Sequence, residues 1–110
     1  GYKNRSLIFQ SLGQWENSLS DITKYLTMHP EDADLWYESG RLKNILNRPS
    51  EALPDLDRAI SLNNKQGLYF YEKMKTLLLL GQKANALQVY SIVQQFGVPI
   101  EPKVQEELNK

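Results

Sequence analysis

Residues 36–63 read WYESGRLKNILNRPSEALPDLDRAISLN, and this stretch decides the fold. In its second half, apolar residues recur at i, i+1, i+4, i+7 and i+8, which is the spacing of one apolar stripe on an α-helix. These residues are Ala52, Leu53, Leu56, Ala59 and Ile60. Just before them, Asn47 indicates a tight turn and Pro49 a helix start, because the fixed φ and missing donor of proline are harmless in a first turn. The stretch therefore predicts two helices joined by a short turn.

The same features return along the chain at a period of 34 residues, and a fixed short period is the mark of a stacked-repeat architecture. The turn residues Gly13, Asn47 and Gly81 are 34 apart. Glycine and asparagine most readily adopt the left-handed conformation that ends a helix. Three sets of apolar residues follow the same shift and are predicted to be core. They are Tyr2, Trp36 and Phe70; Ile22, Leu56 and Tyr90; and Met28, Leu62 and Phe96.

Helices are expected at about 2–12, 16–28, 34–46, 49–62, 67–80 and 84–96, and a seventh is expected to begin near Pro102. The small residues Ser18, Ala52 and Ala86 precede the equivalent leucines Leu19, Leu53 and Leu87. A small residue beside a large one favours a close crossing of two helices. The chain is thus predicted to be all-α.

This pattern resembles the tetratricopeptide repeat (TPR), whose 34-residue unit carries Trp, Leu-Gly, Tyr, Ala, Phe, Ala and Pro at set intervals. The residues that carry the resemblance are Trp36, Gly40, Ala52 and Ala59 in the second unit; Phe70, Gly81, Ala86 and Tyr90 in the third; and Gly13, Trp15 and Pro30 in the first. Ser18, Ser39, Lys43 and Met74 depart from the family's residue types. The resemblance implies a right-handed superhelical stack of antiparallel helix pairs, a TPR-type solenoid, with a concave inner face.

On this resemblance, residues 1–110 form a single domain with units at about 1–32, 33–66 and 67–100. A capping helix over 101–110 is expected to cover the exposed end, with Val104 and Leu108 facing inward. Because the sequence has no starting Met, we expect it to be a piece of a longer protein.

The charge balance argues against nucleic acid as a ligand. Thirteen Lys and Arg oppose thirteen Asp and Glu, so there is no net positive field to attract a phosphate backbone. The sequence has no cysteine, which excludes disulfides and thiolate sites but leaves the compartment open. Its longest apolar run, residues 77–80, is far too short to cross a bilayer, so no membrane insertion is expected.

In the resembled family the first helix of each unit lines the concave groove, and the register places candidate partner-binding residues there. The second and third units share the pattern Tyr-Glu-x-x-(Arg/Lys), and Tyr and Arg are frequent where partners bind. The candidates are Lys3, Asn4, Leu7, Tyr37, Glu38, Arg41, Tyr71, Glu72 and Lys75. On this hypothesis Tyr37 and Tyr71 stack on a peptide. The alternative is that Glu38 with Arg41, and Glu72 with Lys75, are only i,i+3 ion pairs on solvated helix faces.

One TPR subgroup holds the acidic C-terminal tails of heat-shock chaperones with a clamp of basic residues and asparagines. Of the equivalent positions here only Lys3 fits, and Leu7, Glu38, Leu68 and Glu72 occupy the others. Two glutamates in the groove would repel a terminal carboxylate. We therefore expect that chaperone tails are not bound by such a clamp.

No residue pattern favours catalysis, a cofactor or a metal. The single histidine, His29, falls at a predicted helix end, where a capping role is favoured. Glu31, Asp32 and Asp34 are interpreted as caps of the following helix, and Asp55 and Asp57 as residues of a solvated face. The predicted function is a non-enzymatic scaffold or adaptor that binds a protein or peptide in its concave groove. The alternatives are a structural segment of a longer solenoid or a self-associating repeat assembly and, less favoured, an RNA-binding module.

Overall fold

The computed structural model describes residues 15–110, and this part of the chain is entirely α-helical with connecting turns. Its helices are α2 (Trp15–Met28), α3 (Ala33–Ile45), α4 (Pro49–Leu62), α5 (Gly67–Leu79), α6 (Lys83–Phe96) and α7 (Pro102–Asn109). These confirm the predicted helices from 16–28 onward to within one residue at each end, and the predicted helix over 2–12 lies outside the described residues. No helix within 15–110 has the length and apolar character needed to cross a membrane.

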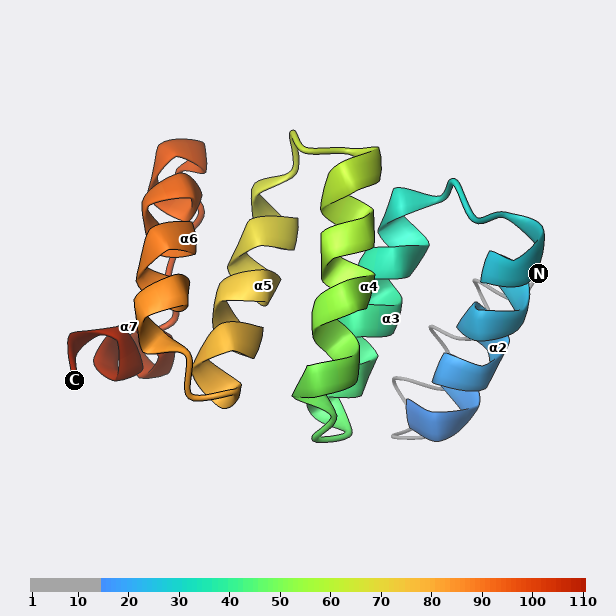
Figure 1. The fold of residues 1–110 in the computed structure, drawn as a ribbon, viewed down its shortest axis with the longest axis horizontal. Helices are drawn as coiled ribbons and strands as arrows, with labels where there is room; N and C mark the ends of the chain where they lie inside the picture. The colour runs from blue at the N-terminus through green and yellow to red at the C-terminus, as the bar shows by residue number, and fades with distance from the viewer. Residues whose placement is uncertain (1–14) are drawn as a thin grey trace.

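The helices follow one another in chain order from α2 to α6 along the long axis of the molecule, and α7 lies at the C-terminal end (Figure 1). Figure 1 looks onto α4, with α3 behind it, so this pair of helices lies in two layers. The molecule measures 40 × 27 × 22 Å, which suits an elongated stack. The all-α stack of helix pairs is as the sequence predicts.

The turns within the second and third units adopt the left-handed conformation that their residues predict. Asn47 has a φ of 63° and Gly81 a φ of 75°. In each turn the next residue's amide closes the preceding helix: the N–H of Arg48 donates to the carbonyl of Lys43 at 2.7 Å, and that of Gln82 to Leu77 at 2.8 Å. These bonds use carbonyls that the helix end would otherwise leave without a partner. The third predicted turn residue, Gly13, lies outside the described residues.

The two helices of the second unit cross closely because Gly40 has no side chain. A Cβ atom at Gly40 would lie 2.7 Å from Cγ of Leu56 and 3.2 Å from the carbonyl oxygen of Ala52. Both Leu56 and Ala52 are fully buried. In the third unit the equivalent contact is made differently, since Met74 takes the place of the glycine and is itself fully buried opposite α6.

The apolar side chains form one core between α2 and α3 and another around α5, α6 and α7. The first contains Leu19, Ile22, Leu26, Leu35 and Leu42. The second contains Tyr71, Met74, Leu77, Ala86, Val89, Val93 and Leu108. Leu108 is buried and Val104 packs against the same core, so α7 covers this end of the stack as predicted.

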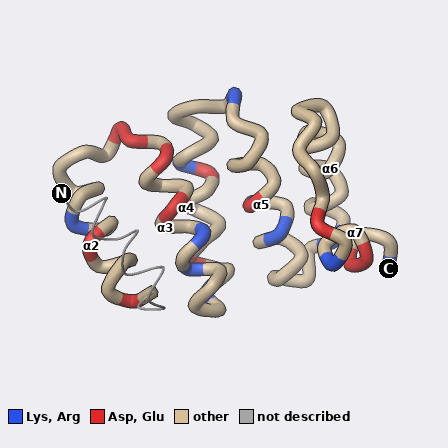
Figure 2. The backbone as a smooth tube through the Cα atoms, turned by 180° about the vertical axis from the view of Figure 1, so that it is seen from behind, with Lys and Arg blue, Asp and Glu red and all other residues tan. Residues whose placement is uncertain are grey.

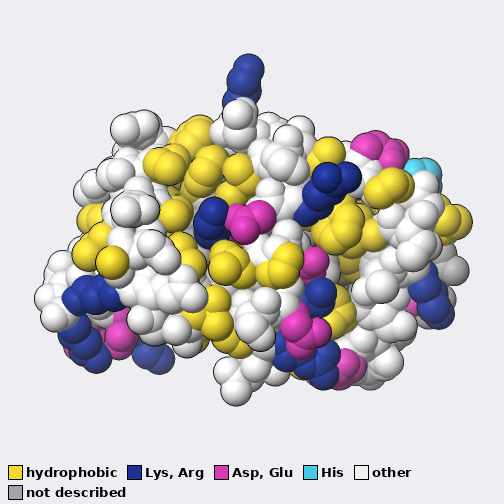
Figure 3. Space-filling model, viewed as in Figure 1, with side chains coloured by type: hydrophobic (Ala, Val, Ile, Leu, Met, Phe, Trp, Pro, Cys, Tyr) yellow, Lys and Arg dark blue, Asp and Glu magenta, His cyan; other side chains and the backbone are white. Residues whose placement is uncertain are grey.

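One predicted core set is wrong. Met28, Leu62 and Phe96 are 60%, 37% and 42% exposed, because each lies in the last turn of its helix, beyond the side chains of the neighbouring helices. Phe96 is covered in part by Phe70, whose ring stacks on it at 5.6 Å. Figure 3 shows hydrophobic side chains gathered at the surface between α6 and α4 on this face of the molecule.

The assignment of Asp55 to a solvated face is also wrong. Its carboxylate is buried and accepts a hydrogen bond from the Ser39 hydroxyl at 2.7 Å, and Lys43 lies 2.8 Å away. Both partners belong to α3, so this pair of interactions joins the helices of the second unit. The neighbouring Asp57 is half exposed and pairs with Lys73 of α5 at 2.7 Å.

Two stacked tyrosines join the second unit to the third. The ring of Tyr37 stacks on that of Tyr69 at 5.0 Å, and the Tyr69 hydroxyl donates a hydrogen bond to Asp34. Burial, together with the nearby carboxylates of Glu72 and Glu38, raises the pKa of Tyr37 to about 12. Burial and the hydrogen bond to Asp34 likewise raise the pKa of Tyr69.

Gly40→Ala is expected to lower the free energy of unfolding by about 1–3 kcal/mol, because the new methyl group must displace the buried side chain of Leu56. Helix propensity alone would favour alanine by up to about 1 kcal/mol. A net loss of stability would therefore be due to the close crossing of the two helices. The measurement is urea denaturation followed by circular dichroism. Gln94→Ala, at an exposed position of α6, is the control and should change stability by less than about 0.5 kcal/mol. A variant at Gly40 that equals or exceeds the wild type in stability would show that the helices can separate freely.

Stability is expected to fall as the pH rises from about 10 to about 12. Tyrosines of the unfolded chain lose their protons near pH 10, whereas folded Tyr37 keeps its proton until about pH 12. The stabilisation from protonated Tyr37 is therefore complete below pH 10 and is lost across this interval. Unfolding free energies of the wild type and Tyr37→Phe across the interval test this, and the fall should be shallower in the variant. The phenolate absorbance of Tyr37 is the difference between the wild type and Tyr37→Phe. If this difference is already complete near pH 10, the prediction is wrong.

Candidate functional site

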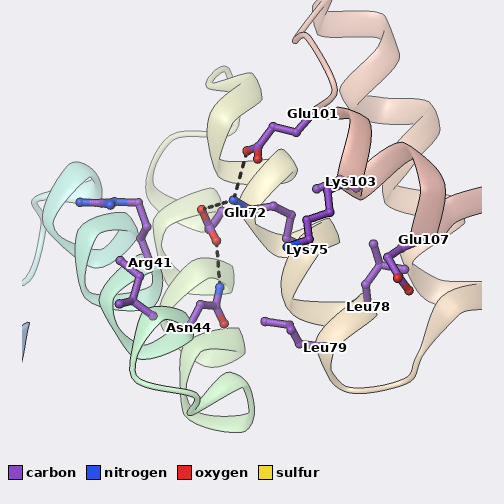
Figure 4. Close-up of a pocket in the computed structure, with 11 residues that line it drawn as sticks. Arg41, Asn44, Glu72, Lys75, Leu78, Leu79, Glu101, Lys103 and Glu107 are labelled. Atoms are coloured by element: carbon purple, nitrogen blue, oxygen red, sulfur yellow. Dashed lines mark hydrogen bonds and ion pairs between the residues drawn. The ribbon is translucent and has the colours of Figure 1, made fainter.

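A pocket of about 520 Å³ lies where the C-terminal halves of α3 and α5 face α7 (Figure 4). Its lining residues are Arg41, Asn44 and Ile45 from α3; Glu72, Lys75, Leu78 and Leu79 from α5; and Glu101, Lys103, Val104 and Glu107 from the C-terminal segment. The α3 residues and their α5 counterparts follow the repeat: Arg41 and Lys75, Asn44 and Leu78, and Ile45 and Leu79 are each 34 apart. Successive units thus present equivalent positions to one groove, and α7 forms its far wall.

The groove exposes apolar side chains to solvent. Ile45 is 43% exposed and Leu79 is 57% exposed, while Leu78 and Val104 are half-buried beside them. Exposed aliphatic side chains in a concave site favour an occupant with apolar groups, because covering them removes apolar surface from water.

A polar network crosses the floor of the groove from α3 to α5. The side-chain amide of Asn44 donates to Glu72 at 2.9 Å and to the Thr76 hydroxyl at 2.7 Å, and Thr76 in turn donates to the backbone carbonyl of Glu72. Lys75 lies 3.5 Å from the other carboxylate oxygen of Glu72. Glu72 is therefore a buried carboxylate with its charge compensated on both oxygens, as its burial requires.

The segment before α7 is fixed to α5 by Tyr71. The backbone N–H of Glu101 donates to the Tyr71 hydroxyl at 3.0 Å, and the carboxylate of Glu101 lies 3.8 Å from Lys75. The Lys75 ammonium is also 5.2 Å from the centre of the Tyr71 ring. Figure 4 shows Lys75 reaching between the carboxylates of Glu72 and Glu101.

The structure brings three of the predicted site residues into this pocket: Arg41, Glu72 and Lys75. Glu38 is on the same helix as Arg41 and pairs with it at 2.8 Å. Tyr37 is half-buried against Tyr69 and does not line the pocket. The predicted residues Lys3, Asn4 and Leu7 lie outside the described residues.

The expected stacking of Tyr71 on a partner is not compatible with its position. Tyr71 is 6% exposed, because the segment leading to α7 covers it and bonds to its hydroxyl. The reasoning from sequence also missed Asn44, Ile45, Leu78 and Leu79. The 34-residue register could have identified these four, since they lie on the α3 and α5 positions that follow Arg41 and Lys75 by three and four residues.

The described part of the chain offers no group of three or more His, Cys, Asp or Glu side chains that could hold a metal ion. The carboxylates predicted to cap the helix after the first unit include Asp32, which accepts a hydrogen bond from the N–H of Leu35 at 3.3 Å and so confirms that role. His29 follows α2 directly and stacks on Tyr25 at 4.5 Å.

Charges of both signs are interleaved across the groove. Seen from the side opposite to Figure 1, α3, α5 and α7 each carry both acidic and basic positions (Figure 2). The pocket is lined by Arg41, Lys75 and Lys103 and by an equal number of glutamates. It has no large field of one sign such as a nucleic-acid backbone selects.

No family model and no curated protein matches this sequence. Solved structures match it over 98% of its length. The TPR2B domain of yeast Sti1 in a pHsp70 complex has a TM-score of 0.86 at 15% identity and is covered over 90% of its length. The first TPR domain of Spaghetti (RPAP3), bound to the HSP90 peptide SRMEEVD, has a TM-score of 0.88 at 18% identity and is covered over 85%. The second TPR domain of human RPAP3, in complex with the HSP70 peptide SGPTIEEVD, has a TM-score of 0.86 at 21% identity and is covered over 89%.

The expectation that chaperone tails are not bound by a carboxylate clamp is contradicted by this comparison. All three similar domains are solved with Hsp70 or Hsp90 ligands. Glu38 and Glu72 would repel a terminal carboxylate only if their charges were uncompensated in the groove. In the structure Glu72 is buried between Asn44 and Lys75, and Glu38 accepts from Arg41, so neither can be counted as an uncompensated charge that repels a ligand.

The comparison therefore agrees with the repeat pattern and with the arrangement of helices from α2 to α7: this chain has the tetratricopeptide-repeat fold.

Proposed function

We propose that this chain is a protein-interaction module that holds a peptide segment of a partner protein in the groove between α3, α5 and α7. The observation that supports this most is the pocket itself, where exposed Ile45 and Leu79 lie beside the cations Lys75 and Lys103. Apolar contact surface next to a few charged groups is typical of a site that binds an amphipathic ligand. A role as a non-enzymatic adaptor is part of the proposal.

Acidic C-terminal peptides are the first candidates for the occupant. The similar domains are solved with the peptides SRMEEVD and SGPTIEEVD or with pHsp70, so domains of this fold bind peptides of this kind. Such peptides combine apolar residues with several carboxylates, and the groove offers apolar surface together with Lys75 and Lys103. The complementarity of charge and apolar surface supports this class of partner.

Nucleic acid is a poorer candidate. The sequence has a formal net charge of zero, and the pocket is lined by as many carboxylates as cations. RNA-binding surfaces rely on a basic groove and on exposed aromatic rings for stacking. Tyr71, whose ring lies 5.2 Å from the Lys75 ammonium, is buried and cannot offer its face to a base.

The direct test is titration of labelled SRMEEVD and SGPTIEEVD with the protein, followed by fluorescence anisotropy, beside a scrambled peptide of the same composition. Saturable binding that discriminates against the scrambled sequence is the expected result. If both tail peptides fail to bind, a peptide mixture from a digested cell extract tests the groove without a preselected ligand. Peptides that the protein retains are identified by mass spectrometry. If the protein binds neither the tail peptides nor any peptide from the extract, the proposal is wrong.

Leu79→Ser is expected to weaken peptide binding about tenfold, because it removes apolar surface that the ligand would cover, worth roughly 1.4 kcal/mol. The side chain is 57% exposed, so its removal should leave the fold intact. Leu87→Ser is the matched control: it is 42% exposed at the start of α6 and does not line the pocket. Equal loss of affinity in the two variants would place the binding surface elsewhere.

A further inference from the structure

We propose that Glu101 is an internal competitor for the groove: its carboxylate occupies Lys75 in the free protein and is displaced by a carboxylate of the incoming peptide. This inference rests on the proposed function and identifies the cation that receives the ligand. Lys75 lies near two glutamates at once, 3.5 Å from Glu72 and 3.8 Å from Glu101. The two contacts differ in whether they can be exchanged.

The contact with Glu72 is permanent. The Glu72 side chain is 6% exposed and takes part in a hydrogen bond with Asn44 across the interface of two units. To release this carboxylate from Lys75 would leave a buried charge with fewer partners, which is strongly unfavourable. A ligand therefore cannot replace Glu72.

The contact with Glu101 is exchangeable. Its side chain is 64% exposed, and ion pairs between exposed groups contribute little. The backbone of Glu101 is held separately, by the hydrogen bond from its N–H to Tyr71. The carboxylate can thus rotate into solvent while the chain entering α7 keeps its place, and the displaced group regains its hydration.

The groove provides a second cation for the same ligand. Lys103 is exposed in the first turn of α7, lines the pocket, and has no ion pair within the described residues. Ile45 and Leu79 supply apolar surface beside these two lysines. The occupant that this arrangement fits is a peptide segment with at least two carboxylates and an apolar side chain next to them.

The test compares Glu101→Gln with Glu107→Gln in binding to SRMEEVD at low ionic strength. Both variants remove one negative charge from the pocket lining, but Glu107 pairs with Lys110 at 2.9 Å and has no ion pair with Lys75. Glu101→Gln is expected to tighten binding about two- to fivefold, the range of an exposed ion pair. Glu107→Gln should change the affinity much less. Equal gains in the two variants, or no gain at Glu101, would overturn the proposal.

A double-mutant cycle identifies the cation. In a Lys75→Gln background the Glu101→Gln substitution should no longer improve binding, because its partner is already absent. Because Lys75→Gln also removes a partner of the buried Glu72, thermal unfolding of each variant checks that the fold is kept. A gain that persists without Lys75 would mean that Glu101 acts only through the general field of the groove, and the competitor model would be wrong.

A neutral peptide separates this inference from the proposed function. SRMQQVN with an amidated C-terminus keeps the apolar residues and lacks the carboxylates. If the groove binds it as well as SRMEEVD, and Leu79→Ser weakens both, the peptide-binding function stands and the role of Lys75 and Glu101 falls. If neither peptide binds, and the protein also binds no peptide from a cell extract, both proposals are wrong.

Discussion

A buried carboxylate, that of Glu72, sets the requirement around which the groove is organised. A charge removed from water must be compensated by hydrogen bonds and an opposite charge, or folding becomes strongly unfavourable. Asn44 supplies the hydrogen bond from the neighbouring unit and Lys75 supplies the charge from the same helix. Both partners must therefore lie at the floor of the groove, and the α3–α5 spacing that lets Asn44 reach Glu72 also fixes the distance between Ile45 and Leu79. One polar contact between units thus links the packing of the stack to the shape of its candidate binding surface.

The fold could be predicted from the sequence because its determinants are local and repeat. The apolar stripe of α4 reports a helix without reference to any other segment, and Asn47 and Gly81 mark turns through their own backbone preferences. A period of 34 residues then implies that equivalent helices stack in the same way. Of the candidates chosen by the same register, Arg41, Glu72 and Lys75 line one pocket in the structure. The 34-residue register predicts the position of a side chain on its helix.

The register carries no information about what covers a side chain. Tyr71 and Tyr37 are equivalent in sequence, yet Tyr71 is buried because the segment before α7 passes over it, and no such segment follows the second unit. Asp55 was misassigned for a related reason, since its burial depends on Ser39 and Lys43 of another helix. The exposed Phe96 shows the converse, because an apolar residue in a last turn extends beyond its neighbours. Each error concerns a contact between segments that the periodicity does not describe.

The C-terminal helix joins stability to recognition, and this follows from two contacts made by one short segment. Leu108 completes the core around Met74 and Val93, so α7 must be docked for that end of the stack to exclude water. Docking α7 also brings Glu101 and Lys103 to the edge of the groove. A cap that served stability alone could present any polar residues there, because the core side of α7 does not constrain its outer face. The hydrogen bond from the backbone N–H of Glu101 to the hydroxyl of Tyr71 fixes where the start of α7 lies, with the Glu101 carboxylate 3.8 Å from Lys75. The place at which the Glu101 side chain meets the groove is thereby set by the same segment that closes the fold.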